Sequence, residues 1–221
     1  MLFFLLFFGS LFVLFLLSHS LTRTLSLSLY HLTHSKKLTV QIVAFLFFPG
    51  TVLHELAHAI MAGVLGVRVG TMEFVPVIEG DRVKLGSVQI AQTDFFRRFL
   101  IGAAPFFIGT SILLSILFYA SQNDLFNTLW IVILIGYVVF EIGNTMFSSK
   151  KDMEGAIELL ITLLILLIIF YFLGVRVPAF DPNIVLENAT VQDVLQKGTY
   201  FLLVPITIDI VIIAVLKFLK R

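Results

Sequence analysis

The residues with the clearest capacity for chemistry are His54, Glu55 and His58, which stand in the order His-Glu-Leu-Ala-His. On a helix, a separation of four residues corresponds to about 400° of rotation and about 6 Å of rise, so both imidazoles share one face. Two imidazoles at this spacing can bind one zinc ion, and Glu55 would lie about 100° away, near the metal. The pattern predicts a metallohydrolase site with His54 and His58 as ligands and Glu55 as general base.

The composition places this pattern in a membrane. Of the 221 residues, 59% are hydrophobic and only 13% are charged, whereas a soluble domain has about 25% charged residues. The net charge of +1 gives no basic face for nucleic acid, and a chain without cysteine has no disulfide, thiolate metal site or cysteine nucleophile. An ordinary cytosolic enzyme, a disordered chain and a nucleic-acid-binding protein are therefore excluded. Because ionisable groups in hydrocarbon normally persist only when paired or functional, a metal site is favoured over a merely polar helix.

Hydropathy predicts an all-α polytopic membrane protein in which residues 1–221 form one integral domain with about six transmembrane helices. Each span needs about 20 mostly apolar residues. A secretory signal peptide is the alternative for the first span, but no basic region or small-residue cleavage site precedes His19, so a retained span is favoured. The predicted spans are Leu2–Leu21, Leu38–Gly66, Phe95–Ala120, Leu125–Phe147, Gly155–Leu173 and Thr199–Leu216, with the catalytic core at residues 38–173.

Two features interrupt the helical pattern around the histidines. Pro49-Gly50 should kink or restart the second span just before them, since proline removes a helix donor. Residues 67–92 alternate apolar and polar side chains, which predicts a β-hairpin or small sheet at the membrane surface. Its turn is expected at Glu79–Arg82, and a phase slip at Gly86-Ser87 predicts a bulge.

Six spans place both termini on one side of the membrane. Residues 22–37 and 174–198 then form polar connections on the other side. The larger share of the 15 Lys and Arg residues falls on the side of the termini and the hairpin. The positive-inside rule therefore predicts that both termini and the hairpin are cytoplasmic in a multi-pass protein of the cell membrane.

A catalytic zinc ion takes three protein ligands and keeps one open position, so a third ligand must come from another segment. The candidates are Glu141, Asp152, Glu154 and the remaining histidines. His19, His31 and His34 are predicted on the opposite side of the membrane, His31 and His34 as solvated interfacial residues. Asp152 is preferred because it would open the fifth span, where the helix dipole favours a carboxylate. A simple capping role, with Asp152 and Glu154 facing water, stays open.

The sequence from His54 to His58 inside a predicted span resembles the site-2 protease family of intramembrane zinc metalloproteases. Members of that family carry a second segment, N-x-x-P-x-x-x-L-D-G, whose Asp is the third zinc ligand. Asn144 and Asp152 have the same separation here. The resemblance implies that Asp152 is the third ligand and that Asn144 orients polar groups near the metal, although Asn144 could equally cap the end of its span.

The second segment departs from the family pattern at several positions. Phe147 stands in the place of Pro, Lys151 in the place of Leu and Met153 in the place of Gly. The family's G-P-x-x-N element is represented by Gly102–Pro105, which keeps a Gly and a Pro but has no Asn. The resemblance extends over roughly residues 49–155.

These observations predict an intramembrane zinc endopeptidase that hydrolyses a peptide bond in or near the transmembrane segment of a membrane-protein substrate. Glu55 would take a proton from the attacking water and return it to the leaving amine. The hairpin would hold the unwound substrate as an added strand, or would serve only as a structural connection. Two other functions stay open, a membrane metallohydrolase with a small or lipid-like substrate and a non-catalytic zinc-binding membrane protein. The second has no need of the base Glu55, and isolated Glu141 and Asp209 do not form a transport path.

Overall fold

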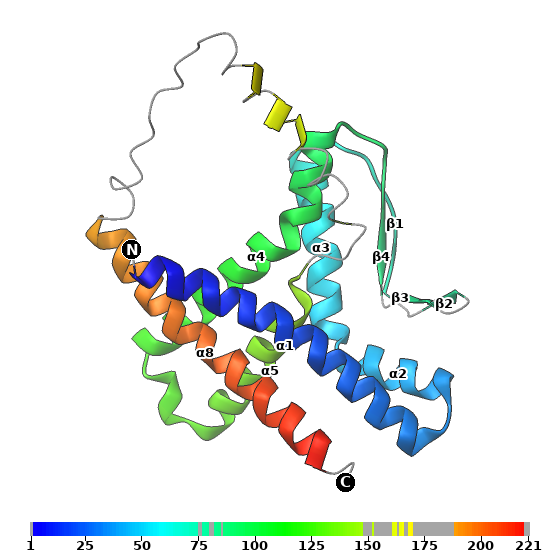
Figure 1. Cartoon of the computed structure of the whole chain (residues 1–221), viewed down its shortest axis with the longest axis vertical. Helices are drawn as coiled ribbons and strands as arrows, with labels where there is room; N and C mark the ends of the chain where they lie inside the picture. The colour runs from blue at the N-terminus through cyan, green and yellow to red at the C-terminus, as the bar shows by residue number, and fades with distance from the viewer. Residues whose placement is uncertain are drawn as a thin grey trace.

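The computed structural model of the chain describes residues 2–74, 77–79, 82–84, 86–147, 152, 161–162, 164–165, 168–169 and 188–218. Helices dominate this part of the chain, and two small antiparallel sheets lie to one side of them (Figure 1). The helices are α1 (Leu2–Thr33), α2 (Lys36–Leu46), α3 (Phe48–Val64), α4 (Phe95–Gln122), α5 (Leu129–Thr145) and α8 (Ala189–Phe218). The strands are β1 (Val69–Glu73), β2 (Val77–Glu79), β3 (Arg82–Lys84) and β4 (Ser87–Ile90), and a 3-10 turn, η1 (Leu125–Asn127), lies between α4 and α5.

Within the described residues, three helices are long and apolar enough to cross a membrane, namely α1, α4 and α8. The pair α2 and α3, bent by 70°, adds a fourth span if it counts as one. Helix α5, which covers the predicted fourth span, has only 17 residues. The predicted fifth span, Gly155–Leu173, lies largely outside the described residues. A mostly helical fold with a small sheet is therefore confirmed, whereas six transmembrane helices are not established.

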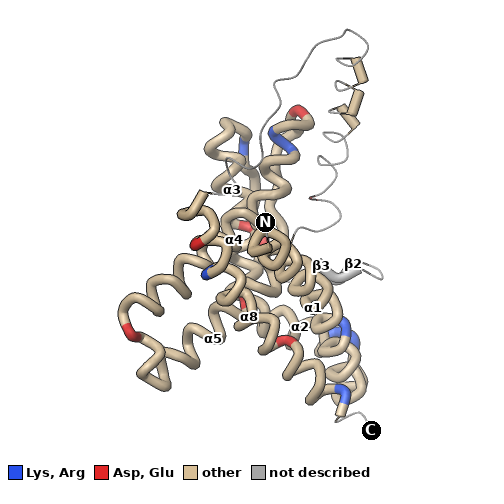
Figure 2. Tube along the Cα trace, turned by 60° about the vertical axis from the view of Figure 1, so that its left-hand side comes forward, with Lys and Arg blue, Asp and Glu red and all other residues tan. Residues whose placement is uncertain are grey.

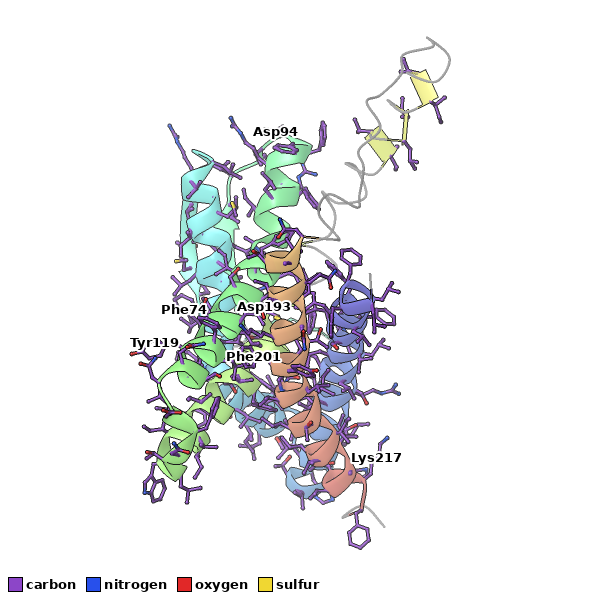
Figure 3. The ribbon with its side chains drawn as sticks, turned by 90° about the vertical axis from the view of Figure 1, so that its left-hand side faces the viewer. Phe74, Asp94, Tyr119, Asp193, Phe201 and Lys217 are labelled. Atoms are coloured by element: carbon purple, nitrogen blue, oxygen red, sulfur yellow. The ribbon has the colours of Figure 1, made fainter. Side chains whose placement is uncertain are left out.

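The surface of the helices supports membrane association. Large apolar side chains are widely exposed, including Phe12 at 61% and Trp130 at 78%, and only a bilayer or a partner protein could cover so much apolar surface. Charged residues lie mostly toward the ends of the helices (Figure 2). Figure 3 shows Lys217 at the end of α8 and Asp94 at the start of α4. The Asp94 carboxylate accepts a hydrogen bond from Arg97 N–H at 3.0 Å, which stabilises its ionised form and lowers the pKa of Asp94.

Two connections predicted as polar loops are partly helical, so the expected bounds of the first and sixth spans were too short. Helix α1 continues to Thr33 and α8 begins at Ala189. Hydroxyl groups do not end these helices because they bond the carbonyl four residues earlier, as Thr22 Oγ1 does with Ser18 O at 3.0 Å. At the start of α8, Asn188 Oδ1 accepts from the N–H of Thr190 at 3.0 Å and caps the helix.

Helices α1 and α8 lie side by side and run in the same direction (Figure 1). Their contacts keep a constant offset, since Phe7 packs against Gly198 and Leu21 lines the same apolar cavity as Ile212. Their starts therefore lie at one end of the pair and their ends at the other. Figure 1 accordingly shows the N and C ends of the chain at opposite ends of this pair, whereas the six-span prediction places both on one side.

The core lies where α4 and α5 join the α1–α8 pair. Leucine side chains from three of these helices are fully buried there, among them Leu14, Leu113 and Leu202. Helix α5 comes closest at Gly143, where an added Cβ would lie 3.1 Å from Pro205 and 3.7 Å from Leu14. The absent side chain thus lets three helices meet around the last turns of α5.

The predicted break at Pro49-Gly50 is confirmed, because α2 ends at Leu46 and α3 begins at Phe48 with proline in its first turn. Helix α5 holds the new helix at this point. The N–H of Gly50 donates to Glu141 Oε2 at 3.0 Å, and an added Cβ on Gly50 would lie 2.8 Å from Glu141 O. The break therefore turns the His54 helix toward the end of α5.

The predicted hairpin is confirmed as two consecutive two-stranded antiparallel sheets, β1 with β4 and β2 with β3. Glu79 pairs with Arg82 at the expected turn. The bulge is displaced from its predicted position, because the register shift lies between Val69 and Met72 rather than at Gly86-Ser87. Gly70 lies within the shifted stretch, where glycine tolerates the distorted backbone of a bulge. Gly86 instead precedes β4 and packs against α3.

We expect Gly143→Val to lower the free energy of unfolding by about 1–3 kcal/mol, because the added side chain would overpack against Pro205. Gly136→Val is the matched control on the same helix, since nothing lies within 4 Å of a Cβ at that position. The control should stay within about 0.5 kcal/mol of the parent protein. Denaturant unfolding in detergent measures both, and equal effects would contradict the close packing at Gly143.

Candidate metal centre

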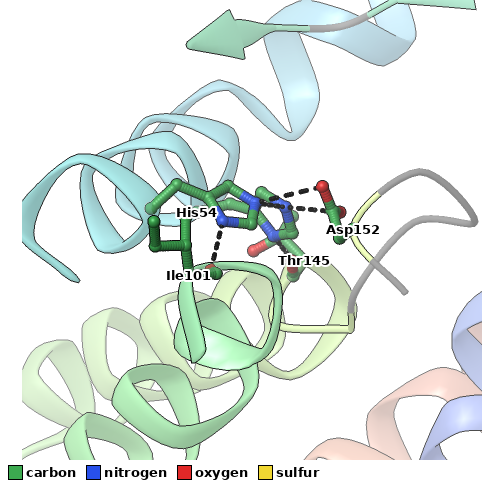
Figure 4. A network of polar contacts seen from close by, with 5 residues as sticks. His54, Ile101, Thr145 and Asp152 are labelled. Carbon is green, nitrogen blue, oxygen red and sulfur yellow. Dashed lines mark hydrogen bonds and ion pairs between the residues drawn. The ribbon is translucent and has the colours of Figure 1, made fainter. Parts of the chain in front are cut away.

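The two histidines and the aspartate chosen from the sequence lie together in the structure (Figure 4). One turn of α3 brings the Nε2 atoms of His54 and His58 to 3.2 Å. Asp152 Oδ2 lies 3.6 Å from His54 Nε2, and its Oδ1 lies 3.4 Å from His58 Nε2. Among the described residues, these three side chains form a group that could hold a metal ion.

The spacing of the donor atoms fits a small tetrahedral ion. Bonds of about 2.0–2.2 Å at tetrahedral angles place neighbouring donor atoms about 3.3–3.6 Å apart. The separations of 3.2, 3.4 and 3.6 Å lie close to this range. The side chains are also shielded, with exposed fractions of 14% for His54, 5% for His58 and 18% for Asp152. Little bulk water would therefore compete with a bound ion for these donor atoms.

Backbone carbonyls fix the tautomer of both imidazoles. His54 Nδ1–H donates to Thr145 O at 2.6 Å, and His58 Nδ1–H donates to Ile101 O at 2.7 Å (Figure 4). Each Nε2 is then left with a free lone pair that faces the other imidazole and the carboxylate of Asp152. Acceptors facing one another repel, and a cation between them removes that repulsion. Such a hydrogen bond on the second nitrogen is the usual support of a metal-bound histidine.

Each carbonyl is available for a different reason. In a regular helix, Ile101 O would accept the N–H of residue 105, but Pro105 has no N–H. Thr145 is the last residue of α5, where carbonyl groups have no partner within the helix. The proline inside α4 and the end of α5 therefore supply the two acceptors that orient His54 and His58.

A glycine in α4 allows Asp152 to reach the histidines. A Cβ added at Gly102 would collide with the carbonyl oxygen of Asp152. Gly102 and Pro105 thus act on the site through the backbone, one by permitting close approach and the other by freeing a carbonyl. The sequence reading assigned them no role of their own, although a Gly-x-x-Pro segment within a span is a visible signal.

Glu55 lies beside the histidines but is not part of the candidate ligand group. Its side chain is 9% exposed, on the same helix. A Cβ added at Gly86 would lie 3.2 Å from Glu55 Cγ and 3.4 Å from its Oε1, so the chain entering β4 covers this carboxylate. Glu55 is therefore enclosed between α3 and the start of β4, one residue along the helix from His54.

The other residues considered from the sequence take different positions. Glu141 binds Gly50 N–H at 3.0 Å and does not belong to the ligand group, and Glu154 lies outside the described residues. Asn144, expected near the metal, donates to Phe140 O at 3.0 Å and to Asp209 Oδ1 at 2.8 Å. Its side chain therefore faces α8, and its neighbour Thr145 makes the contact with the metal site. None of His19, His31 and His34 joins the described group.

Comparisons of the chain with protein-family models, with curated proteins and with solved structures find no match. What the site can do chemically is therefore inferred from the side chains that form it. Two oriented imidazoles, one carboxylate and a buried glutamate beside them can bind a divalent ion and transfer a proton next to it.

We expect Pro105→Ala to weaken metal binding by about tenfold or more, the range seen when support of a ligand histidine is lost. The new N–H at position 105 would compete with His58 for Ile101 O. Pro205→Ala is the matched control, because it alters a proline within α8, a helix that contributes no residue to the ligand group and no carbonyl to its histidines. Zinc titration with a competing chelator measures the affinity. Equal affinities in both variants would show that the freed carbonyl does not support His58.

Proposed function

We propose that the protein is an intramembrane zinc metalloprotease, a hydrolase that cuts a peptide bond in or near the transmembrane segment of a membrane-protein substrate. The observation that carries this proposal is the convergence of His54, His58 and Asp152 with the buried Glu55 beside them, in a bundle of apolar helices. Two nitrogen donors and one carboxylate at tetrahedral spacing favour zinc over calcium or magnesium, which prefer sites built from oxygen.

The residues of the chain divide the work of peptide hydrolysis. His54, His58 and Asp152 would hold the zinc ion, which would supply the Lewis acidity needed at the scissile carbonyl and the attacking water. Glu55, one position from His54 and shielded from bulk solvent, accepts the proton of the attacking water and returns it to the leaving amine. Thr145 O and Ile101 O keep His54 and His58 in the tautomer that leaves Nε2 free for the ion. Because both acceptors belong to the backbone, the donor positions are set before the substrate arrives.

The sheet beside Glu55 supports a peptide as the substrate. A peptide bond within a helix is shielded by its own hydrogen bonds, so the substrate must become extended near the metal. Ala91 N–H donates to Arg68 O at 3.0 Å. Alternation along a strand then places the N–H groups of Val88 and Ile90 on the edge of β4 that faces away from β1. We propose that the unwound substrate pairs with this edge, which leads toward Glu55 through Gly86.

We expect Glu55→Gln to retain zinc and to lower the cleavage rate by at least about 100-fold, because the amide cannot accept the proton. Asp152→Ala should instead lose zinc and cleavage together, which separates a ligand from a base. Glu73→Gln, at an exposed position in β1, is the matched control and should keep both. Metal analysis and cleavage of a reconstituted transmembrane substrate provide the measurements. Unchanged cleavage by Glu55→Gln would exclude Glu55 from the mechanism.

We expect Val88→Pro to lower kcat/KM for a transmembrane substrate by about tenfold or more, since proline removes an N–H that a paired substrate strand would use. Val88→Ala is the control, because it shortens the side chain and keeps the N–H. Zinc content should match the parent protein in both variants. If proline and alanine reduce cleavage equally, strand addition at this edge is wrong and the sheet serves as a structural connection.

A further inference from the structure

A second buried polar contact lies where α5 meets α8, away from the candidate ligands. Asp209 of α8 is fully buried, with 0% of its surface exposed. Asn144 Nδ2 donates to Asp209 Oδ1 at 2.8 Å. The other two oxygen atoms of the pair, Asp209 Oδ2 and Asn144 Oδ1, are buried without a hydrogen-bond partner. The described part of the structure thus places two orphaned acceptors on two side chains that already touch.

The two orphaned atoms are complementary in one protonation state only. A neutral carboxylic acid and a primary amide form a closed pair, in which the amide N–H donates to the acid carbonyl and the acid O–H donates to the amide oxygen. Asn144 and Asp209 already make the first of these bonds. One hydrogen on Asp209 Oδ2 would supply the donor for the second and satisfy both orphaned oxygens together.

An ionised Asp209 would find little compensation in its surroundings. On α1, the ionisable groups are His19, Arg23, Tyr30 and His31, and all four are exposed. On α5, Glu141 is directed to Gly50 of α3, and Tyr137 is neutral at physiological pH. Lys197, on α8 itself, pairs with Asp193 at 2.7 Å near the start of that helix. A buried carboxylate without a cationic partner is strongly disfavoured in a dry apolar environment.

We propose that Asp209 is a proton-binding site, and that its protonated carboxyl closes an acid–amide pair with Asn144 that fastens α8 to the last turn of α5. The backbone around Asn144 is also in contact with α1 and with α8. Ser18 Oγ of α1 donates to Asn144 O at 2.9 Å, and Gly143 packs against Pro205 of α8. The next residue, Thr145, carries the carbonyl that orients His54. The proton therefore supports the segment of α5 on which the metal centre relies.

The isosteric variant Asp209→Asn tests the proposal because its amide permanently supplies the hydrogen that the acid would carry. We expect Asp209→Asn to unfold at the same temperature as the parent protein, or higher, at neutral pH. At alkaline pH the parent protein should lose stability relative to this variant, as deprotonation leaves a buried charge. Asp209→Ala, which removes the pair, should unfold at a lower temperature. Asp193→Asn is the matched control on the exposed part of α8. In this variant the unfolding temperature should change between neutral and alkaline pH by the same amount as in the parent protein.

Infrared spectroscopy provides a second measurement, which reports the protonation state of the carboxyl group directly and not through protein stability. The carbonyl band of a protonated carboxylic acid should be present at neutral pH, absent from Asp209→Asn and retained in Glu141→Gln. The proposal is wrong if no such band is assigned to Asp209, or if Asp209→Asn destabilises the protein as much as Asp209→Ala. Stabilisation of the parent protein by sodium chloride but not by choline chloride, lost in Asp209→Asn, would show that a cation occupies the site in place of the proton.

Discussion

The hydrogen bonds from the two imidazoles to backbone carbonyls are the interaction on which the geometry of the candidate metal centre depends. His54 and His58 lie one turn apart on α3, but that spacing alone leaves each ring free to rotate and to choose its tautomer. Thr145 O and Ile101 O remove this freedom. Neither carbonyl has a partner within its own helix, because Thr145 is the last residue of α5 and because Pro105 of α4 has no N–H to donate to Ile101 O. The histidines are thus oriented by backbone carbonyls that have no hydrogen-bond partner within their own helices.

The sequence was informative about the ligands because their chemistry is local. The spacing of His54 and His58 follows from helical periodicity, and the resemblance selected Asp152 from several acidic residues, a choice that agrees with its position in the structure. The supporting groups could not be read in the same way. A carbonyl oxygen is present in every residue, so Ile101 and Thr145 carry no signal in their side chains. Asn144 is the opposite case, because its side chain suggested either a polar role near the metal or a cap at the end of its span. It donates to Phe140 O in the last turns of α5 and to a buried carboxylate on α8.

The fold was predictable where hydropathy decides it and was missed where packing decides it. The break at Pro49-Gly50 and the strand region follow from local residue types and are present. The end of α1 was misplaced because serine and threonine look like loop residues in a sequence but bond their own helix when little water competes, as Thr22 does. The start of α8 was misplaced because charged residues make it too polar for a span, although Asp193 and Lys197 pair one turn apart within the helix. The parallel packing of α1 with α8 depends on contacts such as Phe7 with Gly198. A single sequence does not indicate that residues so far apart along the chain are in contact.

Helix α5 links these observations, because its last two turns contact α1, α3 and α8. Glu141 holds the start of α3, Gly143 admits α1 and α8, Asn144 binds Asp209, and Thr145 orients His54. Its neighbours bind this short helix through buried polar groups as well as through the apolar core, and such hydrogen bonds are expensive to break where water is scarce. Displacing this segment would disturb the imidazoles without touching a ligand. The geometry of the centre is therefore a property of the surrounding bundle as much as of the His-Glu-Leu-Ala-His sequence.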